Sequence, residues 1–156
     1  MIKILLSINI ILCSCSIWAQ TDLRKFNTDY CTNYPEGTPS QPELWKNCCL
    51  VHDMFMWVGG NTQDRYDSDR YLLHCIENKG APKIARLMYT AVRAGSYSPI
   101  KYPSKKWSNG WTARPDFQAL SASEIDLIEA ELFSDYPYIT HAIKEDFLHL
   151  LRVRLE

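Results

Sequence analysis

The stretch "WKNCCLVHDMFMWVGG", residues 45–60, sets His52 and Asp53 side by side, shortly after two adjacent cysteines. Histidine is the side chain that most readily exchanges a proton near neutral pH, and aspartate is a hard oxygen ligand for a cation. On a helix, neighbouring side chains point about 100° apart, so Asp53 would not hold the ring of His52. We therefore expect the two residues to serve different sites.

An imidazole that acts as a base needs an acceptor that fixes its tautomer, and here that acceptor must come from another element. The segment after Gly60 is predicted to be a second helix, antiparallel to the helix that carries His52. In such a pair, residues at the same height have sequence numbers with a nearly constant sum, and this register sets Asp69 near His52. Asp67 ranks second as the acceptor, and an Asp69 that faces solvent is the alternative to both.

The N-terminal stretch "MIKILLSINIILCSCSIWAQ" has one basic residue, Lys3, and then an apolar run that ends in small residues. This layout is typical of a secretory signal and is too short for a membrane span. We expect residues 1–19 to be removed after Ala19, which leaves residues 20–156 as a single secreted or periplasmic domain. The alternative is a lipoprotein signal, in which an acylated Cys15 anchors the chain to a membrane.

The four cysteines outside that signal are an even number in an exported small domain, which predicts two disulfides. Cys48 and Cys49 are too close on one helix to pair comfortably with each other, so two connectivities remain. The helical register favours Cys48 with Cys75, and the remaining bridge would then join Cys31 to Cys49. A structural zinc site is the alternative use of this cluster. Its ligands would be Cys48, His52, His74 and Cys75.

The chain is predicted to be mainly helical, without a strand of clear alternation. Helices are expected over residues 44–57, from a cap at 61 or 62 to 78, over 82–95, from a cap at 121 to 133, and over 138–155. Gly59 and Gly60 end the first of these helices, and Ser121 with Glu124 forms a capping box for the fourth. The proline-rich segment 31–43 is predicted to be a loop.

The net charge of the chain and the composition of one loop indicate which classes of partner the protein could bind. The formal net charge is −1, and it becomes −2 once Lys3 is lost, so no global basic field favours nucleic acid. The loop from Tyr97 to Trp111 mixes aromatic residues with lysines, which suits a lipid headgroup surface. The alternative is that this loop covers the core of a small domain. The candidate membrane contacts are Trp107, Trp111, Lys105 and Lys106.

These features together resemble the core of secreted phospholipase A2. In "CCLVHD" two adjacent cysteines stand two residues before His-Asp, and Asp69 stands six residues before Cys75, as in that family. The resemblance covers residues 31–75, and "RAGSYSP" and "KWSNGW" further along resemble a bacterial branch of such proteins. It implies a disulfide-stapled antiparallel helix hairpin, with a catalytic core at 31–80 and a family-divergent part at 81–156. It also implies the bridges Cys31–Cys49 and Cys48–Cys75.

The resemblance further implies calcium-dependent hydrolysis of the sn-2 ester of phospholipids at a membrane surface. His52 and Asp69 would be the catalytic pair. Asp53 would bind calcium together with backbone carbonyls near Tyr34, Glu36 and Gly37. A catalytically inert relative that binds lipid or a partner protein is the alternative function.

The sequence departs from the family at two places that matter for this function. The loop "CTNYPEGT" has one glycine, Gly37, where the family loop is glycine-rich, although Glu36 adds a carboxylate. Met56 stands where vertebrate members have a tyrosine that supports the aspartate, a role that Tyr66 or Tyr71 would have to take. The alternative to calcium binding by Asp53 is an ion pair with Arg65 or Arg70.

Overall fold

The computed structural model describes residues 22–97 and 106–153, and its regular elements are five α-helices. Among these described residues, β structure is limited to isolated bridges such as Leu23 with Trp111. The predicted mainly helical class is therefore confirmed. The helices are α1 (Lys46–Val58), α2 (Thr62–Asn78), α3 (Pro82–Tyr97), α4 (Ala122–Ser134) and α5 (His141–Val153).

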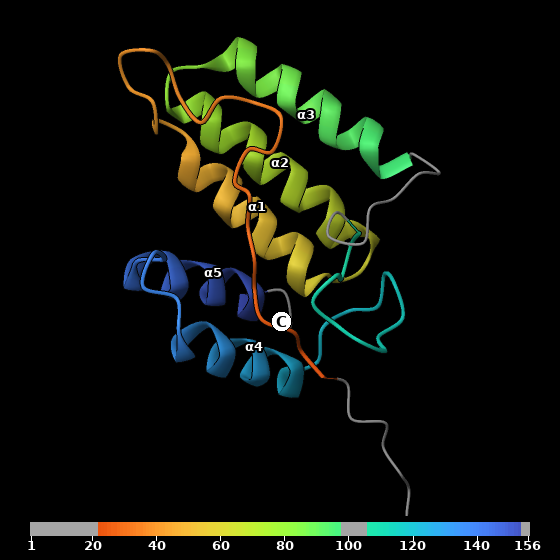
Figure 1. The fold of residues 1–156 in the computed structure, drawn as a ribbon. Helices are drawn as coiled ribbons and strands as arrows, with labels where there is room; N and C mark the ends of the chain where they lie inside the picture. The colour runs from red at the N-terminus through yellow and green to blue at the C-terminus, as the bar shows by residue number, and fades with distance from the viewer. Residues whose placement is uncertain (1–21, 98–105, 154–156) are drawn as a thin grey trace, which may run out of the picture.

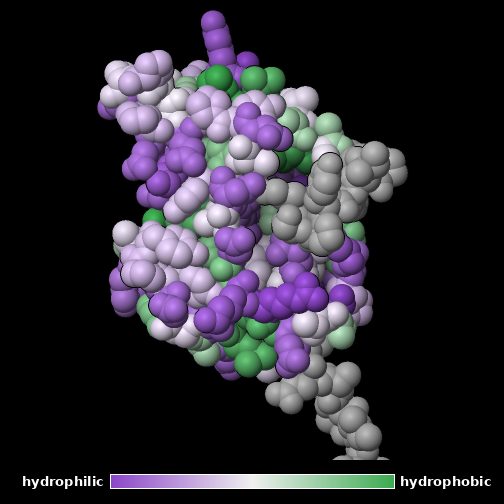
Figure 2. Space-filling model, in the orientation of Figure 1, coloured by the Kyte–Doolittle hydropathy of each residue, from purple (hydrophilic) through white to green (hydrophobic). Residues whose placement is uncertain are grey.

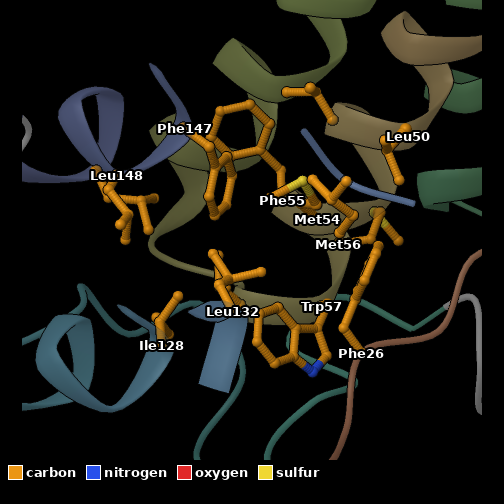
Figure 3. Packing of buried hydrophobic residues seen from close by; sticks show 14 of the residues in the cluster. Phe26, Leu50, Met54, Phe55, Met56, Trp57, Ile128, Leu132, Phe147 and Leu148 are labelled. Atoms are coloured by element: carbon orange, nitrogen blue, oxygen red, sulfur yellow. The ribbon is translucent and has the colours of Figure 1, made fainter. Parts of the chain in front are cut away.

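Helix α1 is the central element of the fold. Ten of its thirteen residues are buried, as expected for a helix that is apolar on nearly all sides. Helices α2 and α3 lie on one side of it and the α4–α5 pair on the other (Figure 1). Phe55 of α1 meets Phe147 of α5 edge to face, with ring centroids 4.9 Å apart. Figure 3 shows these two rings in one cluster with Trp57 and with Leu132 of α4, which packs α1 against the α4–α5 pair. A second cluster of buried residues packs the start of α1 against α2 and α3.

The helix ends show which local signals the chain uses. Asn61 and Ser121 each form a capping box, with Asp64 and Glu124 respectively. Gly59, at φ 73°, follows the last residue of α1 in the left-handed region that suits glycine. Three boundaries differ from the predicted ones by two residues or more, and the first is the start of α1, at residue 46 instead of 44. Helix α3 continues through residue 95 to 97, and α5 begins at 141 because residues 136–140 form a turn in which the N–H of residue 139 donates to the carbonyl of residue 136.

Both predicted disulfides are present. Cys48–Cys75 joins the start of α1 to the end of α2, so the two helices run antiparallel, and Cys31–Cys49 ties the proline-rich loop to α1. The alternative of a structural zinc site is wrong, because the sulfurs of Cys48 and Cys75 are bonded to each other. His74, which that site required, is exposed and lies 3.2 Å from Glu77.

The described end of the aromatic loop, residues 106–111, packs against the end of α1. Trp107 and Trp111 are only 4% and 5% exposed. Their indole N–H groups donate to the carbonyls of Gly60 and Val58, at 2.8 and 2.7 Å. The expectation that these two rings contact a membrane is thus corrected: they cover the core, which satisfies the carbonyls at the end of a helix. Lys106 is exposed and pairs with Asp116, while Lys105 lies outside the described residues.

On the face shown in Figure 2, hydrophilic side chains predominate, and apolar ones gather at the lower edge over α4. Leu127 and Phe133 are exposed apolar residues of that helix. None of the helices in the described part of the chain is long and apolar enough to span a bilayer. The predicted signal at residues 1–19, with Cys15, lies outside the described residues.

Residues 22–30 are extended and run alongside α1 (Figure 1). The N–H of Arg24 donates to the carbonyl of Gly110 at 2.7 Å, and the indole of Trp57 donates to the carbonyl of Arg24 at 2.9 Å. Phe26 is buried, and its N–H donates to the hydroxyl of Tyr136 at 2.7 Å. These bonds connect the N-terminal segment to α1, to the aromatic loop and to the turn before α5.

Replacing Tyr136 by phenylalanine tests the last of these connections. Its hydroxyl accepts the Phe26 N–H and donates to Glu131 at 2.6 Å, and burial raises the pKa of this phenol, so it remains a donor. We expect Tyr136→Phe to lower the free energy of unfolding by about 1–3 kcal/mol, because a buried N–H loses its acceptor. Urea unfolding measures the change. Tyr138→Phe, the same deletion on an exposed ring, should change it by less than about 0.5 kcal/mol; equal losses would contradict the expectation.

Candidate active site

The structure places His52 and Asp69 in contact across the seam between α1 and α2. Nε2 of His52 lies 2.8 Å from Oδ1 of Asp69, whose side chain has no exposed surface. The alternative of a solvent-facing Asp69 is therefore wrong. Asp67, the second-ranked acceptor, instead accepts a hydrogen bond from the Gln63 amide at 3.1 Å.

Two guanidinium groups share the carboxylate of Asp69. Nη1 of Arg65, one turn earlier on α2, lies 3.3 Å from Oδ1, and Nη1 of Arg93, on α3, lies 3.0 Å from Oδ2. Burial acts to raise the pKa of Asp69, but the hydrogen bond from His52 and the two guanidinium groups outweigh burial and lower it. The carboxylate therefore stays ionised at neutral pH, and it connects three helices.

The residues around this cluster differ from those that the resemblance implies. Met56, at the position of the supporting tyrosine, has its sulfur in contact with Nη1 of Arg65. The guanidinium of Arg93 lies over the ring of Tyr66, 5.3 Å from its centroid, and Tyr71 packs edge to face against a phenylalanine of α1. Arginine side chains thus occupy places beside the aspartate that a tyrosine was expected to fill.

Asp53 faces a different environment from that of His52. Its Oδ2 accepts a hydrogen bond from the hydroxyl of Thr28 at 2.6 Å. The residue also lines a cavity of about 220 Å³ between α1, the N-terminal segment and the aromatic loop. The two neighbouring side chains therefore serve separate sites, as their angular separation predicts. The other lining residues are Arg24, Lys25, Asn27, Thr28, Asp29, Met56 and Asn109.

The loop expected to provide calcium ligands is engaged elsewhere. The carbonyl of Glu36 accepts the backbone N–H of Trp45 at 2.9 Å, and the carbonyl of Pro35 accepts its indole N–H at 2.7 Å. Trp45 precedes Asp53 by eight residues, which is about 12 Å along a helix axis. The structure therefore does not bring the carbonyl of Glu36 together with Asp53.

Gly37 has a packing role in the same loop. A Cβ atom at this position would lie 1.9 Å from the carbonyl oxygen of Gln41, so a larger residue would force the backbone apart. Tyr34 lies in a turn in which its N–H donates to the carbonyl of Cys31 at 3.0 Å. These contacts account for the single glycine of the loop without an ion.

Oxygen donors for a cation do lie near Asp53, in the N-terminal segment. Asp29, the Thr28 hydroxyl and the Asn27 amide line the same cavity, and calcium prefers oxygens of these kinds. Within residues 22–97 and 106–153, no group of three or more His, Cys, Asp or Glu side chains is arranged to hold a metal ion. The side chains beside Asp53 thus carry oxygens of the kinds that calcium prefers, and they come from residues 27–29.

Arg65, Arg93 and Thr28 are site residues that the sequence analysis missed. The first had a local signal, because arginine and aspartate four residues apart on a helix form a favourable pair. Arg65 or Arg70 is the alternative partner of Asp53 in the sequence; in the structure Arg65 pairs with Asp69, and the guanidinium of Arg70 lies over the Tyr66 ring. Arg93 and Thr28 come from distant segments and had no local signal.

Comparison of the chain with protein-family descriptions, with curated proteins and with solved structures finds no match. What the site can do therefore follows from its geometry. With Nε2 of His52 directed at Asp69, Nδ1 is the ring nitrogen that can accept a proton from water. The site offers a base, an acid that orients it, and a second carboxylate beside a cavity.

The buried carboxylate gives a pH-dependent prediction. Asp69→Asn should lower the free energy of unfolding near pH 7 by about 3–5 kcal/mol, because two guanidinium groups lose their counter-ion. The pKa of Asp69 is lower in the folded protein than its ordinary value of about 4. Its contribution to stability is therefore complete above about pH 5 and is lost as the pH falls through the folded-state pKa. Urea unfolding from neutral to acid pH should show the gap between wild type and variant closing.

Asp67→Asn is the matched control, since it removes the same charge two residues earlier on α2, where the side chain is half-buried. We expect it to cost less than about 0.5 kcal/mol at neutral pH. Equal losses for the two variants, or a gap for Asp69→Asn that widens in acid, would show that the buried charge cluster does not stabilise the fold.

Proposed function

We propose that this protein is a secreted, calcium-dependent phospholipase A2-like hydrolase that cleaves the sn-2 ester of phospholipids. The observation that carries the proposal is the contact of 2.8 Å between His52 Nε2 and Asp69 Oδ1 across two antiparallel helices. The Cys48–Cys75 bridge holds those helices together. This arrangement supports a phospholipase A2-like hairpin as the catalytic core, residues 31–80, with a divergent part at 81–156.

The chemistry follows from the orientation of the imidazole. Nδ1 of His52 takes a proton from a water molecule, whose oxygen bonds to the ester carbonyl carbon. Asp69 accepts the hydrogen bond from Nε2 and stabilises the positive charge that develops on the ring. The proton then passes to the departing oxygen as the ester C–O bond breaks. The products are a fatty acid and a lysophospholipid, and no covalent bond forms to the protein.

Asp53 would hold the calcium ion, with oxygens of Asn27, Thr28 and Asp29. When bound, calcium supplies positive charge for the phosphate and for the ester oxygen of the substrate. Asp53 follows His52 directly in the chain, so the same turn of α1 fixes the base and the carboxylate that would face the ion.

The two disulfides support an oxidising compartment. Together with the signal-like N-terminal sequence they support export, either as a secreted or periplasmic protein or as a lipoprotein attached through Cys15. The expected partner is a phospholipid surface.

One observation favours a second function, a catalytically inert module that binds lipid or a partner protein. Arg65 and Arg93 both pair with the carboxylate that would orient His52. Buried ion-pair networks of this kind also occur for structural reasons alone. In that case the cluster would stabilise the hairpin without supporting hydrolysis.

Replacing the base separates these two functions. His52→Gln should lower the release of fatty acid from mixed phospholipid vesicles by about 10²- to 10⁴-fold, because the variant lacks a general base. Removal of calcium with a chelator should stop the release by the wild-type protein, and added calcium should restore it. Titration of released fatty acid measures both effects.

His74→Gln is the control, since this histidine is exposed at the far end of α2 and pairs only with a neighbouring acid among the described residues. Its activity should equal that of the wild type. Vesicle binding without fatty acid release, unchanged in His52→Gln, would overturn the hydrolase proposal and support the inert module.

A further inference from the structure

We propose that the cavity beside Asp53 binds the anionic phosphodiester of a lipid head group directly, through Arg24 and Lys25. If the proposed function holds, anionic phospholipids are the preferred substrates, and this part of the inference rests on that function. The binding of a phosphodiester is inferred from the residues of the cavity alone and does not depend on hydrolysis. Arg24 and Lys25 line the same cavity as Asp53, and neither side chain belongs to the His52–Asp69 cluster.

The N-terminal segment directs these cations toward the cavity. Phe26 is buried in the core, and Thr28 turns its hydroxyl toward Asp53. Arg24, Lys25 and Asn27 are exposed and line the cavity. The residues that hold the segment and the residues that face the cavity are therefore different ones.

The backbone that carries the cations is fixed before any ligand arrives. The N–H of Arg24 donates a hydrogen bond to the carbonyl of Gly110 at 2.7 Å. The carbonyl of Arg24 accepts one from the indole N–H of Trp57 at 2.9 Å. Two residues further along, Phe26 is bonded to the hydroxyl of Tyr136. Preorganisation of this kind reduces the entropy that is lost when a ligand binds.

The side chains match a phosphodiester in chemistry. A guanidinium can donate two parallel hydrogen bonds to phosphate oxygens, a lysine adds a point charge, and an amide such as that of Asn27 adds a neutral donor. The cavity, at about 220 Å³, is smaller than the roughly 300 Å³ at which pockets begin to hold drug-sized ligands. Its size therefore suits a head group better than a whole lipid.

The cavity lies within one helical turn of the candidate base along α1. Met56 lines it, and Met56 follows His52 by one helical turn, on the same face of the helix. Asp53 and Asp29 line the same cavity, and a calcium ion held by these carboxylates would add positive charge beside the phosphate to that of Arg24 and Lys25.

The test uses the disulfide-bonded wild-type protein with glycerophosphoglycerol, a soluble anionic diester that has no acyl ester to hydrolyse. Binding is measured by calorimetry with a calcium chelator present, so that an ion at Asp53 cannot contribute. Arg24→Gln/Lys25→Gln should bind about tenfold more weakly than the wild type, since two charged donors are lost. Lys83→Gln/Arg86→Gln, the same charge change at two exposed residues of α3, should bind like the wild type.

Several outcomes would overturn the subsite. They are the absence of diester binding, an equal loss in both double variants, and inorganic phosphate binding as tightly as the diester, which would indicate a site for free phosphate. Unfolding midpoints equal to that of the wild type check that the exposed substitutions leave the fold intact.

Hydrolysis of phosphatidylglycerol and phosphatidylcholine vesicles separates failure of the subsite from failure of the proposed function. Preferential hydrolysis of the anionic vesicles that Arg24→Gln/Lys25→Gln reduces about tenfold, and the α3 control does not, supports the inference. Diester binding without hydrolysis of either lipid leaves the subsite standing and overturns the hydrolase. Hydrolysis with a lipid preference unchanged in Arg24→Gln/Lys25→Gln overturns the substrate assignment alone.

Discussion

The buried carboxylate of Asp69 is the constraint on which the arrangement of the first three helices depends. It receives His52 from α1, Arg65 from its own helix and Arg93 from α3, and none of its surface is exposed. A charge without partners in such a place costs several kcal/mol, so its donors must approach together. The Cys48–Cys75 bridge sets the register of α1 against α2, and the carboxylate sets how α1 and α3 are rotated toward α2.

The rotation of α1 about its axis determines which neighbours its other side chains contact. Because His52 turns toward Asp69, Asp53 must point about 100° away, and there it meets Thr28 and the cavity. Phe55 then faces α5 and forms the core with Phe147. One helix therefore supplies the histidine that contacts Asp69, one wall of the cavity and the centre of the core, so a change that rotates it disturbs all three.

The parts of the fold that sequence could predict are those with local or register signals. Capping residues at Asn61 and Ser121 fixed two helix starts, and the short connection after Gly60 fixed the hairpin that places Cys48 near Cys75. Long-range choices had no such signal. The aromatic loop has a composition that suits a membrane or a core equally well, and only the open carbonyls at the end of α1 show why Trp107 and Trp111 are buried.

Arg93 had no local signal either, because its partner lies 24 residues away on another helix. The loop that was expected to bind calcium also shows that the partners of polar groups cannot be predicted from composition. Its sequence offers oxygens to an ion, but Trp45 takes two of its carbonyls, a competition that composition does not reveal. Local patterns thus predicted the elements and their ends, whereas the partners of individual polar groups depended on contacts between distant segments.

The two arginines also decide whether burial is compatible with the role proposed for Asp69. Burial alone would raise the pKa of this carboxyl and so favour its neutral form. A neutral carboxyl could not stabilise a positive charge on the imidazole. The hydrogen bond from His52 and the charges of Arg65 and Arg93 together keep it ionised, but each arginine also attracts part of the charge that would otherwise act on His52. The cation–π contacts of Arg65 with Trp107 and of Arg93 with Tyr66 hold both guanidinium groups in place. In the proposed mechanism, the strength with which Asp69 supports His52 therefore depends on Trp107 of the aromatic loop and Tyr66 of α2, which hold these guanidinium groups.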